Sequence, residues 1–176
     1  MRFFVTEKDT ITTKVLVDTS GSYPRVLVQP QKRFVLGSEL FGEKPEQRQA
    51  KFDELQGKYE KDVALATTVT LEFTWQYWGY ELRSSIYRDA TVENARGERV
   101  IDQDLLNKGK VRKLLVGWNL MDEGKAIPVV RDSKTKELDA ATLKLVLSLE
   151  PAILLAAINK LDDSLYPGFK DEEEKN

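Results

Sequence analysis

The stretch Val69-Thr70-Leu71-Glu72-Phe73-Thr74-Trp75-Gln76-Tyr77 decides the fold class, because its side chains alternate between apolar and polar at every step. A period of two is typical of a β-strand with one buried and one exposed face. Phe73, Trp75 and Tyr77 share the apolar face, and aromatic rings bury much area there. Glu72 falls on the opposite face, so we expect it to face solvent rather than serve as a tuned catalytic acid.

The alternation breaks at Trp78-Gly79 and resumes over residues 80–88, where Tyr80, Leu82 and Ile86 share one face. We interpret residues 80–88 as a second extended segment, joined to the first by a hairpin or a bulge at Gly79. Trp78 falls on the other side of the alternation, so we expect it to be exposed beside Tyr80. Trp and Tyr are over-represented at contact hot spots, and both residues are therefore predicted to bind protein.

Short extended segments precede this strand. Residues 12–18 alternate with a period of two, and residues 25–29, which include two valines, again have extended character. The turn formers between them, residues 19–24, predict a hairpin. Another short extended segment is expected at residues 33–36.

The composition changes to a charged, helix-forming sequence over residues 43–62. Phe52, Leu55 and Tyr59 form its only apolar stripe, so such a helix buries little. Gly57 weakens it by about 1 kcal/mol relative to alanine. Two interpretations stay open: a solvated surface helix, which is the commoner situation, or a helix that is ordered by contact with a partner.

After residue 100 the apolar period lengthens to that of a helix, with Asp102 or Asp104 as its N-cap. The residues at i, i+3, i+4 and i+7 spacing are Val111, Leu114, Leu115 and Trp118. A turn is expected at residues 122–125, followed by a short extended segment and a charged loop over residues 131–137.

The C-terminal part of the chain predicts two apolar helices, one from Asp139 to about Leu149 and one from Pro151 to about Leu165. They are apolar around more of their circumference than one sheet contact requires. Either they are sandwiched inside the monomer, or one face is left for a partner or for self-association. On the second interpretation the protein-binding residues of the last helix are Leu154, Ile158 and Leu161.

Strands followed by helices predict an α+β fold, in which a small antiparallel sheet from the N-terminal half packs against two or three C-terminal helices. We expect a single domain over residues 1–169, strand-rich over 1–93 and helix-rich over 101–165. Residues 43–62 form a charged mobile helix or insertion in this scheme. Residues 170–176 are expected to be a disordered acidic tail.

The composition of this 176-residue chain limits the classes of function that we expect. It has no histidine and no cysteine, so common proton shuttles, thiol nucleophiles and soft metal ligands are missing. The acids at positions 102, 104, 122 and 123 match no calcium loop, and no phosphate-binding glycine motif occurs. We therefore expect a non-enzyme with no catalytic, cofactor-binding or metal-binding residue. A small enzyme that uses carboxylates is the least favoured alternative.

Charge and hydropathy limit the classes of partner that we expect. Basic and acidic groups number 27 and 29, which gives a net charge of −2 and no strong attraction to nucleic acid. Charges begin early at the N-terminus, and no apolar run reaches the length that a membrane helix needs. We expect a cytoplasmic protein whose partners are other proteins, with neither nucleic acid nor membrane among them.

The segment Lys110–Val130, which contains Trp118-Asn119-Leu120 and is followed by a charged linker and a leucine-rich helix pair, resembles small tailed-bacteriophage proteins. Such proteins are tail assembly chaperones or minor structural components. The resemblance covers about residues 105–165. It implies a factor that binds tape-measure, tail-tube or other virion subunits in the host cytoplasm, with Trp118 closing a helix and binding protein, and Asn119 shaping the turn. A permanent connector or tail component, in which strand 69–77 extends a sheet between subunits, is the alternative.

Overall fold

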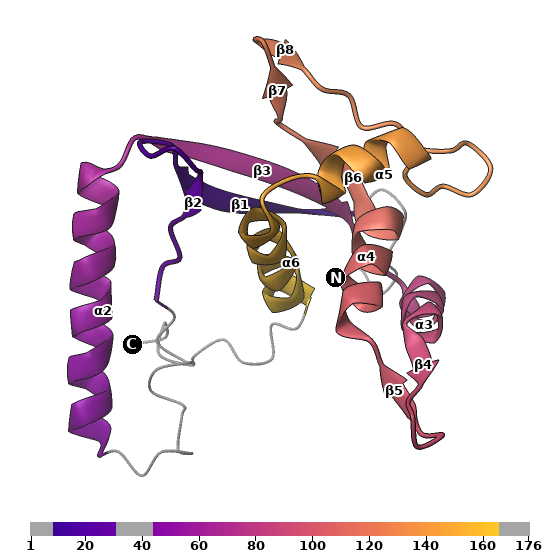
Figure 1. Ribbon diagram of the computed structural model, residues 1–176, viewed down its shortest axis with the longest axis horizontal. Coiled ribbons are helices and arrows are strands. Elements are labelled where there is room, and N and C mark those ends of the chain that lie inside the picture. The colour runs from indigo at the N-terminus through magenta and orange to yellow at the C-terminus, as the bar shows by residue number, and fades with distance from the viewer. Residues whose placement is uncertain (1–8, 31–43, 166–176) are drawn as a thin grey trace. The chain divides into compact units, whose positions relative to one another are not determined.

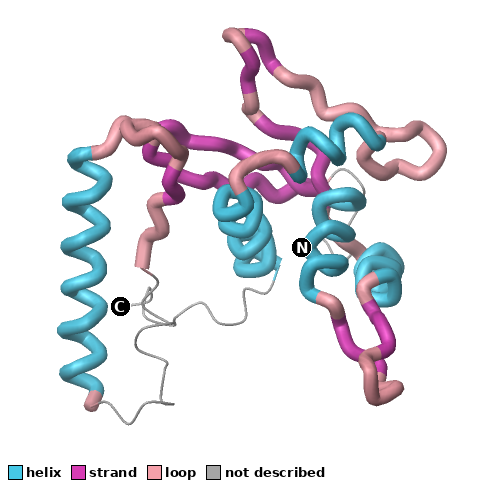
Figure 2. Tube along the Cα trace, in the orientation of Figure 1, coloured by secondary structure: helices cyan, strands magenta, loops and turns pink. Residues whose placement is uncertain are grey.

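The computed structural model describes residues 9–30 and 44–165, and Figures 1 and 2 show their helices and strands. The N-terminal elements are β1 (Thr10–Asp18), β2 (Arg25–Val26), α2 (Pro45–Leu65), β3 (Thr68–Gln76) and α3 (Tyr80–Asp89). The C-terminal elements are β4 (Thr91–Glu93), β5 (Arg99–Ile101), α4 (Gln103–Leu114), β6 (Leu115–Trp118), β7 (Met121–Asp122), β8 (Lys125–Ala126), α5 (Ala140–Leu147) and α6 (Pro151–Leu165). The predicted α+β class is confirmed.

The described residues fall into two compact units. One unit contains residues 9–15 and 71–165, and the other contains residues 16–30 and 44–70. Strands β1 and β3 each run from one unit into the other. Nearly all of the largest fully buried side chains belong to the first unit: Trp75, Phe73, Ile86, Leu114, Leu115, Leu161, Val15, Val111 and Val146. The second unit therefore has little core of its own.

A four-stranded sheet has the order β2-β1-β3-β6. The predicted alternating strand is confirmed as β3, and Phe73 and Trp75 are fully buried with their rings stacked 6.2 Å apart. Strand β6 pairs antiparallel with β3, placing Trp118 opposite Phe73. Strand β3 lies between β1 and β6, and residues 73–75 of β3 pair with β6.

The predicted N-terminal hairpin is confirmed as β1 and β2, whose register pairs Val17 with Val26. Thr13, Val15 and Val17 are buried on one face of β1, as their alternation predicts. Strand β2 is shorter than predicted and ends at Val26. The segment predicted at residues 33–36 lies outside the described residues.

The prediction of an extended segment at residues 80–88 is wrong, because this segment forms helix α3. Leu82, Ile86 and Ala90 recur at four-residue spacing, and Ile86 and Ala90 are fully buried. Gly79 is the N-cap of α3 rather than a hairpin turn. The expected exposure of Trp78 is also wrong, since only 6% of its surface is accessible.

Helix α4 begins where the sequence predicts, with the Asp102 carboxylate accepting from the Leu105 N–H at 2.9 Å. It ends at Leu114, however, and residues 115–118 form β6 instead of a last helical turn. The prediction that Trp118 closes a helix is therefore wrong. A paired strand edge on β3 competes with the helix here, and its tertiary hydrogen bonds decide the conformation.

The two predicted C-terminal helices are confirmed as α5 and α6. The Asp139 carboxylate caps α5 by accepting from the Thr142 N–H at 2.7 Å. Among the described residues, no single helix combines the length and apolar character needed to cross a membrane; α5 and α6 reach them only together, and they are bent by 105°. The tail predicted at residues 170–176 lies outside the described residues.

Candidate functional site

The structure distributes the six predicted protein-binding residues between core and surface. Ile158 and Leu161 lie on the buried face of α6, and burial removes both, together with Trp78, from the accessible surface. Trp118 and Leu154 are half-buried. Tyr80 is 86% exposed at the start of α3. Their exposure therefore does not support one continuous binding surface.

Trp78 has an internal role. Its ring lies 6.2 Å from that of Tyr87, and the Arg83 guanidinium lies over both rings at 5.9 and 5.6 Å. Such cation–π contacts stabilise the packed arrangement. Trp118 is likewise used internally, since its indole N–H donates to the Ile127 carbonyl at 2.7 Å. The side-chain oxygen of Asn119 accepts from the Glu72 N–H at 2.8 Å, which ties this residue to β3.

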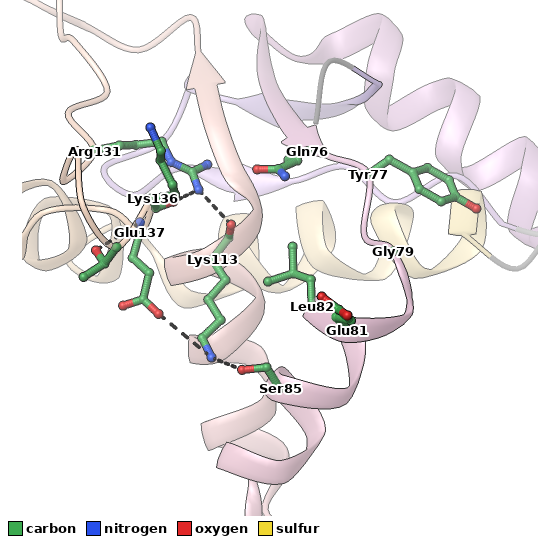
Figure 3. A pocket seen from close by; sticks show the side chains of 11 residues that line it. Gln76, Tyr77, Gly79, Glu81, Leu82, Ser85, Lys113, Arg131, Lys136 and Glu137 are labelled. Carbon is green, nitrogen blue, oxygen red and sulfur yellow. Dashed lines mark hydrogen bonds and ion pairs between the residues drawn. The ribbon is translucent and has the colours of Figure 1, made fainter. Parts of the chain in front are cut away.

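A pocket of about 510 Å³ lies beside α3, and Figure 3 shows its side chains. We call it the α3 pocket. It is bordered by the end of β3, the first turns of α3, the last turn of α4 and the loop before α5. Its lining residues are Gln76, Tyr77, Gly79, Glu81, Leu82, Ser85, Lys113, Arg131, Thr135, Lys136 and Glu137.

The most buried cation of the α3 pocket, Lys113, is held by an internal network. Its ammonium group donates to the Asp89 carboxylate at 2.5 Å and to the Ser85 hydroxyl at 2.7 Å. Glu137 lies 3.9 Å away and pairs with Arg112 at 2.6 Å. A buried charge is tolerated when it is paired in this way. The network therefore ties α3, α4 and the loop before α5 together.

Arg131 is used in the same manner. Its guanidinium donates to the carbonyl oxygens of Leu115 and Lys113 at 3.0 Å each, and to that of Lys136. These bonds join the end of α4 and the start of β6 to the loop, and Figure 3 shows the bond to Lys113. Lys113 and Arg131, the two most enclosed cations of the α3 pocket, therefore both stabilise the fold through internal contacts.

Hydrogen bonds also lower the pKa of several described aspartates. The Lys113 ammonium holds the pKa of Asp89 below its ordinary value, and Ser20 does so for Asp18. Amide and hydroxyl donors lower the pKa of Asp132 and Asp139 at a turn and a helix cap. A general acid that works near neutral pH needs a raised pKa instead. In the described part of the chain, acidic residues form no group of three or more that could hold a metal ion.

Glu72 lies on the outer face of β3, as expected. Its carboxylate pairs with Lys14 at 2.7 Å across two partly exposed side chains. A cross-strand ion pair of this kind contributes little to stability and needs no ligand to explain it.

A second cavity, of about 180 Å³, lies between β2 and α2. We call it the β2–α2 groove. Residues 25–28 and Pro30 form its strand side. Its helix side consists of Leu55, Lys58, Tyr59 and Asp62.

The helix side of the groove is the apolar stripe predicted for this segment. Leu55 and Tyr59 lie one turn apart on α2, as the sequence predicts, and Leu55 is 38% exposed. Helix α2 has 21 residues and none of them is buried. Sequence reasoning left open whether this helix is plain surface or a partner's contact, and it assigned no role to the strand side. The sequence signal on the strand side is Pro30, which ends the strand and is a residue type common at sheet edges.

Comparison of the chain with protein-family models, curated proteins and solved structures finds no match.

Proposed function

We propose that this chain is a non-catalytic protein-binding factor that receives its partner in the β2–α2 groove. One observation carries this proposal: a helix as long as α2 has no buried residue, yet it presents an apolar stripe to a groove. In proteins most helical stability comes from packing of an apolar face. A partner that covers Leu55 and Tyr59 would supply that packing.

The resemblance of residues 105–165 favours assembly of a bacteriophage tail as the setting. The partners would then be tape-measure, tail-tube or other virion subunits, bound in the host cytoplasm. An assembly factor of this kind leaves before the particle is complete. Mass spectrometry of mature particles checks this point, because a permanent tail component would be found in them.

The binding proposal is tested with Leu55→Glu, which places a charge on the helix side of the groove. The matched control is Leu65→Glu, since Leu65 is 86% exposed on the same helix and does not line the groove. Each full-length variant is co-expressed with a tape-measure subunit or a tail-tube subunit of a tailed bacteriophage, and complexes are measured by size-exclusion chromatography with light scattering.

We expect the natural chain and Leu65→Glu to form the complex. Leu55→Glu should weaken it about tenfold or more, because truncating or charging an apolar anchor costs about 2 kcal/mol. Circular dichroism establishes that both variants keep the fold. Equal binding by the two variants, or no complex with either subunit, would contradict the proposal.

A further inference from the structure

Helix α4 ends earlier than its apolar pattern predicts. Val111, Leu114, Leu115 and Trp118 recur at helical spacing, yet the helix ends at Leu114 and residues 115–118 form β6. The local sequence of this segment therefore favours one conformation and the tertiary structure another. A segment of this kind has two arrangements, and contacts that bind one better than the other set their populations.

The end of α4 is closed by the loop before α5. One further helical turn would need the carbonyl oxygens of residues 112–115, because each helical N–H donates to the carbonyl four residues earlier. Three of these four accept from the loop instead: the Leu138 N–H donates to the first at 2.9 Å, and the Arg131 guanidinium donates to the second and the fourth at 3.0 Å each. The loop thus satisfies carbonyls that a helix end leaves without a partner, and it blocks their use by a longer helix.

The donor side of the same turn is also occupied. In a longer α4, the Asn119 N–H would donate to the Leu115 carbonyl. In the structure it donates to the Glu72 carbonyl of β3 at 3.2 Å, and the Asn119 side chain accepts from the Glu72 N–H at 2.8 Å. Both groups of this helical hydrogen bond therefore have other partners, which are Arg131 for the carbonyl and β3 for the N–H.

The pairing that holds β6 is short and irregular. Residues 73–75 of β3 pair with it, and the register shifts between Thr74 and Trp75, which leaves Val116 as an extra residue. Such a bulge interrupts the ladder of hydrogen bonds. Gly117 suits the strand, since a Cβ atom there would lie 3.4 Å from the Thr74 side chain. A ladder of this length adds little stability by itself, so β6 depends on contacts outside it.

We propose that Arg131 controls a conformational switch at residues 115–118. When its guanidinium binds the carbonyls at the end of α4, the segment forms β6. When these bonds are absent, α4 continues through residues 115–118, and residues 73–75 of β3 lose the strand that pairs with them. The switch lies outside the β2–α2 groove, because none of these residues lines that groove.

The first test replaces the guanidinium with an apolar side chain in Arg131→Met. Cα chemical shifts of the full-length protein report the conformation of each residue. We expect extended values at residues 115–118 in the natural chain and a change toward helical values in the variant. Hydrogen exchange at the Glu72 amide should become about tenfold faster or more, because this amide loses its acceptor on Asn119.

Two further variants separate the guanidinium from its charge. Lys134→Met removes a positive charge at an exposed position of the same loop and should change neither readout. Arg131→Lys keeps the charge but lacks the planar fork that reaches two carbonyls, so it should give a smaller change in the same direction. Arg131→Lys also provides the test if Arg131→Met does not fold.

Helix propensity supplies an independent test. Gly117→Ala favours the helical conformation by about fivefold. In the natural chain we expect β6 to persist in Gly117→Ala, because Arg131 still binds the carbonyls. Combined with Arg131→Met, the same change should raise the helical population about fivefold over Arg131→Met alone.

Three results would overturn the switch. Extended shifts at residues 115–118 in both Arg131→Met and Arg131→Lys would show that pairing with β3 alone selects the strand. Shifts typical of a disordered chain, in Arg131→Met and in its combination with Gly117→Ala, would show that no helical alternative exists. An equal effect of Lys134→Met would assign the change to the charge of the loop.

Discussion

At the scale of single residues, the core combines aromatic packing with one polar bond whose partners are far apart in sequence. The Trp75 indole N–H donates to the Thr13 hydroxyl at 2.8 Å, and both side chains are buried. This bond joins β1 to β3 across the interior. A buried donor that loses its acceptor destabilises the folded protein by the full free energy of desolvating that donor.

Thr13→Val should therefore destabilise the protein by about 1–3 kcal/mol, because it keeps the shape of the side chain and leaves the Trp75 N–H without an acceptor. Urea unfolding followed by tryptophan fluorescence measures the change. Thr12→Val, at an exposed position of the same strand, should change the free energy by no more than about 0.5 kcal/mol. Similar losses for both variants would show that the buried bond does not set the cost.

Acid should weaken the Lys113 network. The hydrogen bond from Lys113 lowers the pKa of Asp89 in the folded protein, so its ionised form stabilises the fold above the ordinary pKa of about 3.9. That contribution is lost as the pH falls through the lower folded pKa. We expect the free energy of unfolding to fall below about pH 4, and Asp89→Asn to show a shallower fall. Unfolding curves from pH 7 to pH 2.5 measure both, and parallel curves for the two proteins would exclude Asp89 as a contributor.

At the scale of elements, two helices with an interior glycine differ in their surroundings. Gly109 in α4 faces α3, and a Cβ atom there would lie 3.4 Å from Ile86. Gly57 in α2 has open space around it. The first glycine permits close helix packing, whereas the second only weakens its helix.

Gly57→Ala should stabilise α2 by about 1 kcal/mol, because alanine loses less backbone entropy in a helix and meets no neighbour. Amide hydrogen exchange should slow across α2. The free energy of global unfolding should change much less, since α2 buries no side chain and opens locally. An equal gain in global stability would show that α2 unfolds together with the core.

Helices and strands were predicted correctly where periodicity and capping residues agreed. The prediction failed where the same apolar residues fit both the strand period and the helix period. Strand β3, the cap at Asp102 and the start of α6 at Pro151 follow from the sequence. Residues 80–88 misled because apolar side chains at 82 and 86 satisfy a period of two as well as a helical turn. The helical conformation places Ile86 and Ala90 in the core, where both are fully buried. Their burial depends on segments that pack against α3, and the local sequence does not reveal these.

At the scale of the whole molecule, core and groove belong to different units. The first unit contains nearly all of the largest fully buried side chains, and the second contains α2 and the β2–α2 groove. Binding regions tend to come from the less stable parts of a protein. We therefore expect the second unit, which has few buried side chains, to open more readily than the first.

Limited trypsin digestion should reveal this difference. Within residues 44–165 we expect the first cuts in α2, for example after Lys61, before any cut after Lys108 in α4. Both lysines are exposed, but cleavage requires local unfolding, and α4 is held by buried side chains while α2 is not. Mass spectrometry of early fragments identifies the order. A first cut after Lys108 would contradict the stability difference.

The sequence by itself determined the α+β class, the alternating strand, most helix starts and the polar character of α2, because these depend on period, capping and composition along a local stretch. Only the tertiary structure decided that Trp78, Ile158 and Leu161 are buried, that residues 115–118 pair with β3, and that β2 and β6 are the outer strands of the described four-stranded sheet. Exposure and strand order depend on which segments meet across the fold. Contacts between residues far apart in sequence therefore decide between conformations that the local sequence permits equally.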